Sequence, residues 1–275
     1  MTYAFVFTNY NNSHYTVTAV DSIEQCVWNY QPDIVIVDND SADSEKLILR
    51  ELSEKYINVT VIYNIANVGY FRGLNDGLRF LESKVKSYAS VIIGNNDLIF
   101  NDDFPSQLEV ISDSLGKFPV VAPDIITVAG DHQNPHVLSD PSKLRELIWD
   151  IYYSSYGIAR IMGWVSSVSR KYSERSDYKS WKHSGEILQG YGACYILSPI
   201  FLDRFKTLYS PTFLMGEEYF LQFQLAKEGY KTYYDPRIQV THVDHASTGL
   251  VSSKLLWGYG KKAHKIYRQL SNAAD

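Results

Sequence analysis

The sequence predicts an α/β fold in which helices cover both faces of a mostly parallel sheet. In residues 1–100, short apolar runs typical of buried strands alternate with segments of helical spacing. Each apolar run also ends in polar residues, mainly Asn, Asp and Thr. The chain has 275 residues, of which 45% are hydrophobic and 21% charged, and this ordinary composition excludes a disordered or collagen-like protein. We therefore expect a single globular domain with one inserted segment.

The elements of the first half follow from these patterns. The expected strands are Tyr3–Thr8, Asp33–Val37, Val59–Tyr63 and Ser90–Ile93. The expected helices are Ser22–Trp28, Ser44–Tyr56 and Gly73–Leu81. Because the carboxyl ends of parallel strands meet at one edge of the sheet, ligands bind there in such folds. The polar segments expected at this edge are Thr8-Asn9-Tyr10, Asp38-Asn39-Asp40, Asn64 to Asn67 and Asn95-Asn96-Asp97.

The second half is less regular. Short strands are expected at Phe118–Ala122, Lys231–Tyr234 and Ile238–Thr241, and a helix at Tyr219–Lys227. Residues 130–184 contain an apolar, partly helical piece, Leu144–Val168, and are interpreted as an insertion that forms a lid, an acceptor wall or a contact surface. The tail from Ser252 is helical in pattern and basic.

The charge and the termini exclude several classes of protein. A net charge of -5 argues against a nucleic-acid binder, which would need a basic surface to neutralise phosphates. The N-terminus lacks the basic start of a signal peptide, and no run of about 20 apolar residues is present. Two distant cysteines form neither a disulfide framework nor a zinc site. A cytoplasmic location is therefore expected.

Three segments at the predicted edge have both a chemical and a structural interpretation. Asp97 follows a buried strand and suits Mg²⁺ or Mn²⁺, although Asn and Asp also favour turns at strand ends. Asp38 could accept hydrogen bonds from a base or a ribose, or form an Asx-turn or helix cap. The loop from Asn67 to Gly77 combines glycines with Arg72, which suits phosphate recognition or a tightly packed helix start.

Two further segments carry ionisable side chains. Glu217-Glu218 lies beside Gly216 just before a helix, where a carboxylate acts as a general base or simply favours the helix N-terminus. His242 and His245 flank Asp244 after a short strand, and a histidine there ligates a metal, contacts a diphosphate or is structural.

Taken together and in this order, these segments resemble the nucleotide-sugar glycosyltransferases of family 2, which have the GT-A fold. The resemblance spans about residues 3 to 248, and its most specific parts are most similar to the branch of bacterial rhamnosyltransferases. The matching segments are Thr8-Asn9-Tyr10-Asn11, Val37-Asp38-Asn39-Asp40-Ser41, Asn67-Val68-Gly69, Gly73-Leu74-Asn75, Asn95-Asn96-Asp97, Gly190-Tyr191-Gly192-Ala193, Gly216-Glu217-Glu218 and His242 with Ser247.

The resemblance implies a role for each matching residue. It implies a divalent ion, Mg²⁺ or Mn²⁺, at Asp97 and His242, and a catalytic base at Glu218 beside Glu217. Asn95 stands where the family has the first acid of its metal motif, and Glu218 where it usually has Asp. Gly192 and Ala193 would line the sugar and acceptor pocket. The residues implied to hold the nucleotide are Thr8, Asn9, Tyr10, Asp38, Asn67, Arg72, Asn95 and Asn96.

The implied domain is a GT-A unit over residues 1–250, followed by a basic C-terminal helix over 251–275. Residues 1–100 would be the nucleotide-binding half, and 101–250 the acceptor half with the insertion 130–184. The implied partners are a nucleoside-diphosphate sugar, either dTDP-rhamnose or a UDP-sugar, and a saccharide or lipid-linked acceptor, in the synthesis of a surface polysaccharide such as O-antigen or capsule. The expected reaction is an inverting single displacement.

Two alternatives remain for the function and two for the tail. A nucleotidyltransferase would need a basic, Gly-rich loop after the first strand, where this chain has Thr8 to Asn12 and no basic residue. A non-catalytic module that binds nucleotide-sugars or glycans is the other alternative. The basic tail, with Trp257, Tyr259 and Tyr267, either rests as a peripheral contact on the anionic inner face of the cell membrane or packs on the domain as a solvated helix.

Overall fold

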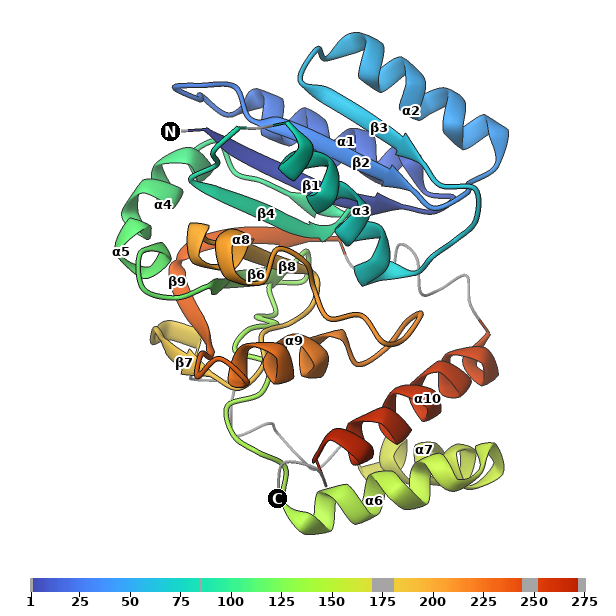
Figure 1. Ribbon diagram of the computed structural model, residues 1–275. Coiled ribbons are helices and arrows are strands. Elements are labelled where there is room, and N and C mark those ends of the chain that lie inside the picture. The colour runs from blue at the N-terminus through green and yellow to red at the C-terminus, as the bar shows by residue number, and fades with distance from the viewer. Residues whose placement is uncertain (1, 85, 170–180, 244–251, 272–275) are drawn as a thin grey trace.

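The computed structural model describes residues 2–84, 86–169, 181–243 and 252–271, and it confirms the α/β class. The described residues form one nine-stranded sheet flanked by helices (Figure 1). The strands are β1 (Tyr3–Asn9), β2 (Asp33–Asp38), β3 (Val59–Tyr63), β4 (Ser90–Asn95), β5 (Leu98–Ile99), β6 (Val120–Thr127), β7 (Gly185–Ile187), β8 (Cys194–Leu197) and β9 (Thr232–His242). The helices are α1 (Ser13–Gln25), α2 (Asp43–Lys55), α3 (Tyr70–Ser83), α4 (Phe104–Val110), α5 (Ser112–Leu115), α6 (Lys143–Ser154), α7 (Tyr156–Ser169), α8 (Pro199–Arg204), α9 (Glu217–Ala226) and α10 (Ser253–Ser271).

The two halves of the sheet differ in strand direction. The order is β3-β2-β1-β4-β8-β6-β9-β5, with β7 paired to β9. The first four of these strands are parallel, as predicted. Beyond them the sheet is mixed, because β8 runs antiparallel to both β4 and β6, while β6 and β9 are parallel. Residue pattern alone does not encode this reversal, since a fully buried strand has the same composition in either direction.

Consecutive side chains of each strand point to opposite faces of the sheet, so a hydrophobic core forms on each face. Phe5 and Phe7 of β1 belong to one buried cluster with side chains of α1, α2 and α4. Val6 lies between them in sequence and belongs to the other cluster, with side chains of α3, α8 and α9. This is the two-residue period of a strand buried on both faces. Both layers of helices hold the strands rigidly, so the strand ends are fixed in space.

Two predicted elements differ from the structure. The first helix spans Ser13–Gln25 and not Ser22–Trp28, because its buried face includes the polar residues Ser13 and Thr16, which hide the apolar period. The two strands expected around Asp235-Pro236 form one strand, β9, whose register with β6 shifts between Pro123 and Asp124. The residues around Asp235-Pro236, which resemble a turn in the sequence, form a β-bulge at this shift.

The insertion and the C-terminal helix form a unit of their own at one end of the molecule. Helices α6 and α7, from the insertion, lie beside α10 (Figure 1). The aromatic residues of the tail pack inside the protein: the Trp257 indole donates a hydrogen bond to the Tyr152 carbonyl at 3.2 Å, and the Tyr267 ring meets Tyr219. The tail is therefore a helix packed on the domain, as the second of its two interpretations expects.

Among the described residues, none of the helices combines the length and the apolar character that crossing a membrane requires.

Candidate functional site

The polar ends of the parallel strands meet at one edge of the sheet, as the sequence predicts. Asn9 at the end of β1 pairs in register with Asp38 at the end of β2. On its other side, Thr8 pairs with Asn95 at the end of β4. The carboxyl ends of three strands thus bring predicted site residues from three separate parts of the chain side by side.

The edge over β1 and β2 is a buried polar network centred on Asn9. The Asn9 amide donates to the Asp38 carboxylate at 2.9 Å and to the Ser41 hydroxyl at 3.1 Å. Its oxygen accepts from Thr16 at 2.8 Å and from Asn96 at 3.2 Å. The Asn9 and Asp38 side chains are fully buried, so the network is satisfied from within the protein.

Asp38 forms a local Asx-type turn with Ser41, which is the structural alternative to ligand binding considered from the sequence. Its carboxylate accepts from the backbone N–H of Ser41 at 3.1 Å and from the Ser41 hydroxyl at 2.5 Å. It does not cap α2, whose N-cap residue is Ala42. The structural interpretation of Asp38 is thus observed, and the nucleotide role of Asn9, Asp38 and Asn96 stays a prediction.

At the next strand end, Asp97 and His242 face each other. The His242 Nε2 atom lies 3.2 Å from Asp97 Oδ1, and both side chains are 3% exposed. Val243 N–H donates to the Asp97 carbonyl at 3.0 Å, which ties the end of β9 to this turn. The strands β5 and β9 pair antiparallel here, so the contact is set by the sheet itself.

A hydrogen bond with Gln133 fixes the orientation of the His242 ring. The His242 Nδ1 atom lies 2.8 Å from the Gln133 side-chain oxygen, which is an acceptor, so Nδ1 carries the donated proton. In the neutral ring Nε2 then offers a lone pair toward Asp97, whose buried Oδ1 has no hydrogen-bond partner among the described residues. A carboxylate oxygen and an imidazole lone pair at this distance repel each other unless a cation or proton lies between them.

This pair fits a divalent ion. Two neighbouring ligands of an octahedral ion with bonds of about 2.1 Å are about 3.0 Å apart, close to the separation of Asp97 Oδ1 and His242 Nε2. The hydrogen bond from Nδ1 to Gln133 is the outer support that metal-bound histidines usually have. Asn95 lies alongside, with its amide nitrogen 3.5 Å from His242 Nε2. The described residues hold no cluster of three His, Cys, Asp or Glu side chains, so these two would share the ion with substrate phosphates or water.

Glu218 lies at the start of α9 and is held by the backbone of Gly192. The Gly192 N–H donates to Glu218 Oε1 at 3.2 Å, and the Gly192 carbonyl accepts from the Tyr70 hydroxyl at 2.8 Å. A Cβ at position 192 would lie 2.8 Å from Glu218 Oε1. Glycine is therefore needed here for the carboxylate to approach the chain.

The neighbouring carboxyl, Glu217, is held in a less polar environment. Its Oε1 accepts from the Met215 N–H at 3.0 Å. Burial, and then the nearby charge of Glu218, raises the pKa of Glu217 from its ordinary 4.5 to about 8. Near neutral pH Glu217 therefore largely keeps its proton.

Residues 191–193 connect the Asp97 edge to Glu218. The Asn95 N–H donates to the Ala193 carbonyl at 2.9 Å, the Tyr191 ring lies 6.0 Å from the His242 ring, and Gly192 between them binds Glu218. Tyr70 is within electrostatic range of both sides, because Glu218 and Asp97 each help to raise its pKa well above 10, after burial as the main cause. One short segment thus brings the predicted metal residues and the predicted base into the same region.

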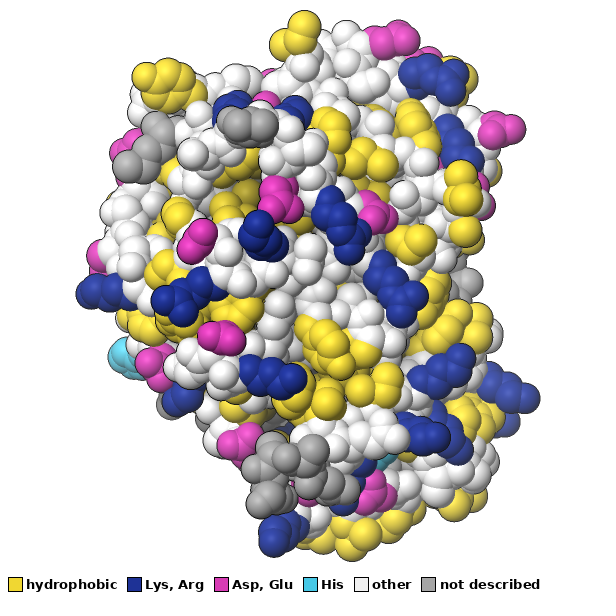
Figure 2. Space-filling model, viewed as in Figure 1, with side chains coloured by type: hydrophobic (Ala, Val, Ile, Leu, Met, Phe, Trp, Pro, Cys, Tyr) yellow, Lys and Arg dark blue, Asp and Glu magenta, His cyan; other side chains and the backbone are white. Residues whose placement is uncertain are grey.

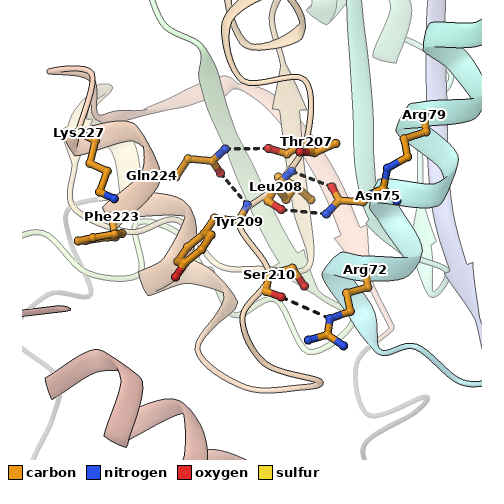
Figure 3. A pocket seen from close by; sticks show the side chains of 10 residues that line it. All are labelled: Arg72, Asn75, Arg79, Thr207, Leu208, Tyr209, Ser210, Phe223, Gln224 and Lys227. Atoms are coloured by element: carbon orange, nitrogen blue, oxygen red, sulfur yellow. Dashed lines mark hydrogen bonds between the residues drawn. The ribbon is translucent and has the colours of Figure 1, made fainter. Parts of the chain in front are cut away.

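Arg72 lies in a different pocket from the other predicted site residues. It lines a cavity of about 490 Å³ with the loop 207–210 and the end of α9, and its Nε donates to the Ser210 carbonyl at 3.4 Å (Figure 3). None of the other predicted site residues lines that cavity. Asn67 is used locally, since its side-chain oxygen accepts from the Gly69 N–H at 3.0 Å. Gly69 has a φ of +91° and packs against the Phe213 backbone, so this loop has the tight packing that the sequence allowed as an alternative.

The remaining predicted residues are at the edge but differ in exposure. Tyr10 is 40% exposed and Thr8 is half-buried. Ala193 is buried and contributes its backbone carbonyl. His245, Asp244 and Ser247 lie outside the described residues.

Sequence reasoning missed three residues of this site. Gln133 and Asn134 lie at the start of the segment interpreted as an insertion, yet they support His242 and the Tyr191 backbone. Tyr70 lies within the glycine-rich loop from Asn67 to Gly77, and nothing in the sequence marks its hydroxyl as part of the site. The polar run His132-Gln133-Asn134, in the loop that follows β6, is the signal that could have found the first two.

The chain belongs to a known family. The sequence model described as Glycosyl transferase family 2 matches residues 5–163, which is more than half of the chain. A comparison with curated proteins found no match.

Solved structures with the GT-A fold are similar to this one. They include GalNAc-T7 with UDP, GalNAc and Mn²⁺, at 14% identity and a TM-score of 0.59, covering 88% of this chain and 44% of that one. Another is the mannosyltransferase PcManGT from Pyrobaculum calidifontis in complex with GDP-Man and Mn²⁺, at 14% identity and a TM-score of 0.55, covering 90% and 58%. A third is S. aureus TarS 1-349, at 13% identity and a TM-score of 0.51, covering 86% and 60%. This chain spans less than two thirds of the length of each, and at these identities the likeness establishes the fold alone.

Proposed function

We propose that this member of glycosyl transferase family 2 moves a sugar from a nucleoside-diphosphate sugar to a hydroxyl group of a saccharide or lipid-linked acceptor, with inversion at the anomeric carbon. The observation that carries the proposal is the arrangement around residues 191–193. On one side is a buried carboxylate oxygen without a hydrogen bond beside an imidazole, and on the other is a glutamate oriented by a backbone N–H. Transfer from a nucleoside diphosphate needs both kinds of group close together.

Glu218 is the proposed general base. It takes the proton of the acceptor hydroxyl as that oxygen attacks the anomeric carbon, which typically contributes about 10²–10⁴-fold to the rate. The hydrogen bond from Gly192 N–H leaves the second carboxylate oxygen of Glu218 for the acceptor. The raised pKa of Glu217 means that this neighbouring side chain largely keeps its proton near neutral pH.

Asp97 and His242 are the proposed residues for a divalent ion, Mg²⁺ or Mn²⁺. When bound, such an ion neutralises the negative charge that develops on the departing nucleoside diphosphate. Asp97 contributes a buried carboxylate oxygen that faces His242 Nε2 at 3.2 Å, and Gln133 holds the other ring nitrogen of His242. The Mn²⁺ and the nucleotides in two of the similar structures support this assignment.

The donor and the pathway are proposed on the resemblance alone. A dTDP-rhamnose or UDP-sugar donor, and a place in the synthesis of a surface polysaccharide such as O-antigen or capsule, follow from the similarity to bacterial rhamnosyltransferases. Thr8 and Tyr10, with their exposed or half-exposed side chains, are the proposed contacts for the base and ribose.

The proposal is tested with a panel of UDP-, dTDP- and GDP-sugars in the presence of Mn²⁺, with release of free nucleoside diphosphate as the readout. Glu218→Gln keeps the shape and the hydrogen bond from Gly192 but removes the base, so we expect turnover to fall by about 10²-fold or more. Glu228→Gln is the matched control, because Glu228 is an exposed glutamate just after α9. Equal turnover by wild type and Glu218→Gln would overturn the assignment.

The second candidate function is a non-catalytic module that binds a nucleotide-sugar or a glycan. It is favoured by Asn95 in place of an acid, and by the polar edge over β1 and β2, which is satisfied internally. Thermal stabilisation by one of the nucleotide-sugars, without release of nucleoside diphosphate with any acceptor tried, would support this candidate.

A further inference from the structure

Helix α6 presents its apolar face to solvent. Leu144, Leu147, Ile148 and Ile151 follow the spacing of a single helical face, and their exposed fractions range from 43% to 67%. No residue of α6 is buried. A surface helix normally turns its aliphatic stripe toward the core, so this orientation is the reverse of the usual one.

The two carboxylates of α6, together with Trp149 and Tyr153, face the protein instead. Glu146 accepts hydrogen bonds from the Tyr267 hydroxyl and from Arg268, both on α10. Asp150 lies 2.7 Å from His264 Nε2, one turn earlier on α10. The carboxylates of α6 are thus used in contacts with α10, and this is what rotates the aliphatic stripe outward.

Helix α7 extends the exposed apolar surface. Ile158 and Ile161 are 39% and 65% exposed, and the two helices pack against each other. Helix α7 contains no acidic residue, and its one charged residue is Arg160. The basic side chains Lys143, Arg145 and Arg160 are exposed on the hairpin, whereas the carboxylates Glu146 and Asp150 are paired with His264, Tyr267 and Arg268 of α10. In Figure 2 hydrophobic side chains lie along the lower edge of the molecule, where Figure 1 places α6.

We propose that this face, formed by Leu144, Leu147, Ile148, Ile151, Ile158 and Ile161, docks on an anionic lipid surface. Aliphatic side chains enter the boundary between headgroups and acyl chains, while neighbouring Lys and Arg side chains meet the negative headgroups. An exposed apolar surface of this kind is unusual on a protein that meets only water. The docking face lies on the insertion, and not on the C-terminal tail that its basic sequence suggested.

Charge favours a lipid surface over a second copy of the chain. A second copy of the same face would offer further Lys and Arg side chains as partners, because the carboxylates of α6 are already paired with α10. An anionic membrane offers the opposite sign to Lys143, Arg145 and Arg160.

The docking face is connected to the loop that carries the proposed base. Helix α10 lies between them: it binds α6 through Arg268, and its Ala263 packs against Gly216, just before α9. Tyr267 of α10 also meets Tyr219 of α9. A membrane-bound hairpin would thus hold the Glu218 side of the molecule close to the lipid surface.

Flotation with vesicles tests the proposal without reference to catalysis. The full chain is mixed with phosphatidylcholine vesicles that contain phosphatidylglycerol, and with vesicles of phosphatidylcholine alone. We expect the wild type to float with the anionic vesicles, and less so at high salt. The double variant Leu147→Glu and Ile151→Glu should bind at least about tenfold more weakly, because two apolar side chains at the contact become charged and acidic.

The matched control is Ile57→Glu, which places the same charge on a fully exposed aliphatic position between α2 and β3. Its flotation should equal that of the wild type, and circular dichroism should show that all variants are folded. Failure of the wild type to float, or flotation of the double variant as strong as that of the wild type, would overturn the proposal. So would a wild-type dimer in analytical ultracentrifugation that the double variant converts to a monomer, since this would assign the face to a second copy.

Discussion

The two polar regions at the edge of the sheet have nearly the same composition but different states. Over β1 and β2, the amides and hydroxyls around Asn9 satisfy one another and the Asp38 carboxylate. Between β4 and α9, the buried Asp97 carboxylate faces the His242 ring at 3.2 Å, and Glu217 has a raised pKa. The polar groups of the first region satisfy one another, whereas the second region holds ionisable side chains close together.

This difference between the two regions indicates which polar residues stabilise the fold and which take part in the reaction. Buried polar groups that bond each other stabilise and orient the backbone. Buried charged groups that lack partners lower stability, and a fold that retains them gains a place where a cation, a proton or a substrate is bound. We therefore assign the Asn9 network to holding the strand ends, and Asp97 and Glu218 to the reaction. The following predictions test this division.

The largest effect is expected at Asp97. Asp97→Asn keeps the shape but removes the charge, so a divalent ion loses its carboxylate and kcat/KM should fall by about 10³-fold, or about 4 kcal/mol. The free energy of unfolding should change little, because the new amide can donate to His242 Nε2, which lies 3.2 Å from Asp97 Oδ1. Nucleoside diphosphate release and urea unfolding measure the two quantities. The control is Asp102→Asn, at an exposed position nearby, and unchanged Mn²⁺-dependent turnover by Asp97→Asn would refute the metal assignment.

The next effect is on stability. Asn9→Ala leaves Asp38, Ser41, Thr16 and Asn96 without a shared partner inside the protein, which should lower the free energy of unfolding by about 3 kcal/mol. Asn29→Ala, at an exposed position, should change it by less than about 0.5 kcal/mol. Urea unfolding at constant pH gives both values. If Asn9→Ala unfolds like the wild type but loses nucleotide binding, the network belongs to the reaction and the division is wrong.

The smallest effect is a dependence on pH. Because the pKa of Glu217 is raised to about 8, the unfolded chain loses this proton at lower pH than the folded protein does. Rising pH between about 5 and 8 therefore lowers wild-type stability, and the loss is complete above pH 8. Glu217→Gln has no proton to lose and still accepts from Met215, so its stability relative to wild type should grow across this window. Thermal unfolding at several pH values measures the difference, and a constant difference would show that Glu217 is ionised in the folded protein throughout.

Much of the fold follows from local pattern, with identifiable exceptions. The apolar runs at β1 to β4 predict the parallel strands, because each is bounded by polar residues; β1, β2 and β4 are buried on both faces, and β3 lies at the edge of the sheet. The start of α1 was missed because its buried face is polar, and β9 was divided because a bulge resembles a turn when only the sequence is considered. Both exceptions arise where contacts distant in sequence override local preference.

For the site, the sequence by itself determined which residues end the strands, and therefore that Asn9, Asp38, Asn95 and Asp97 share one edge. It did not determine which of them are free to react. Only the tertiary structure decided that Asn9 and Asp38 bond to each other, that Gln133 turns His242 toward Asp97, and that Arg72 lies in another pocket. The reason is physical: the state of a polar group depends on the partners that reach it, and here those partners come from distant parts of the chain.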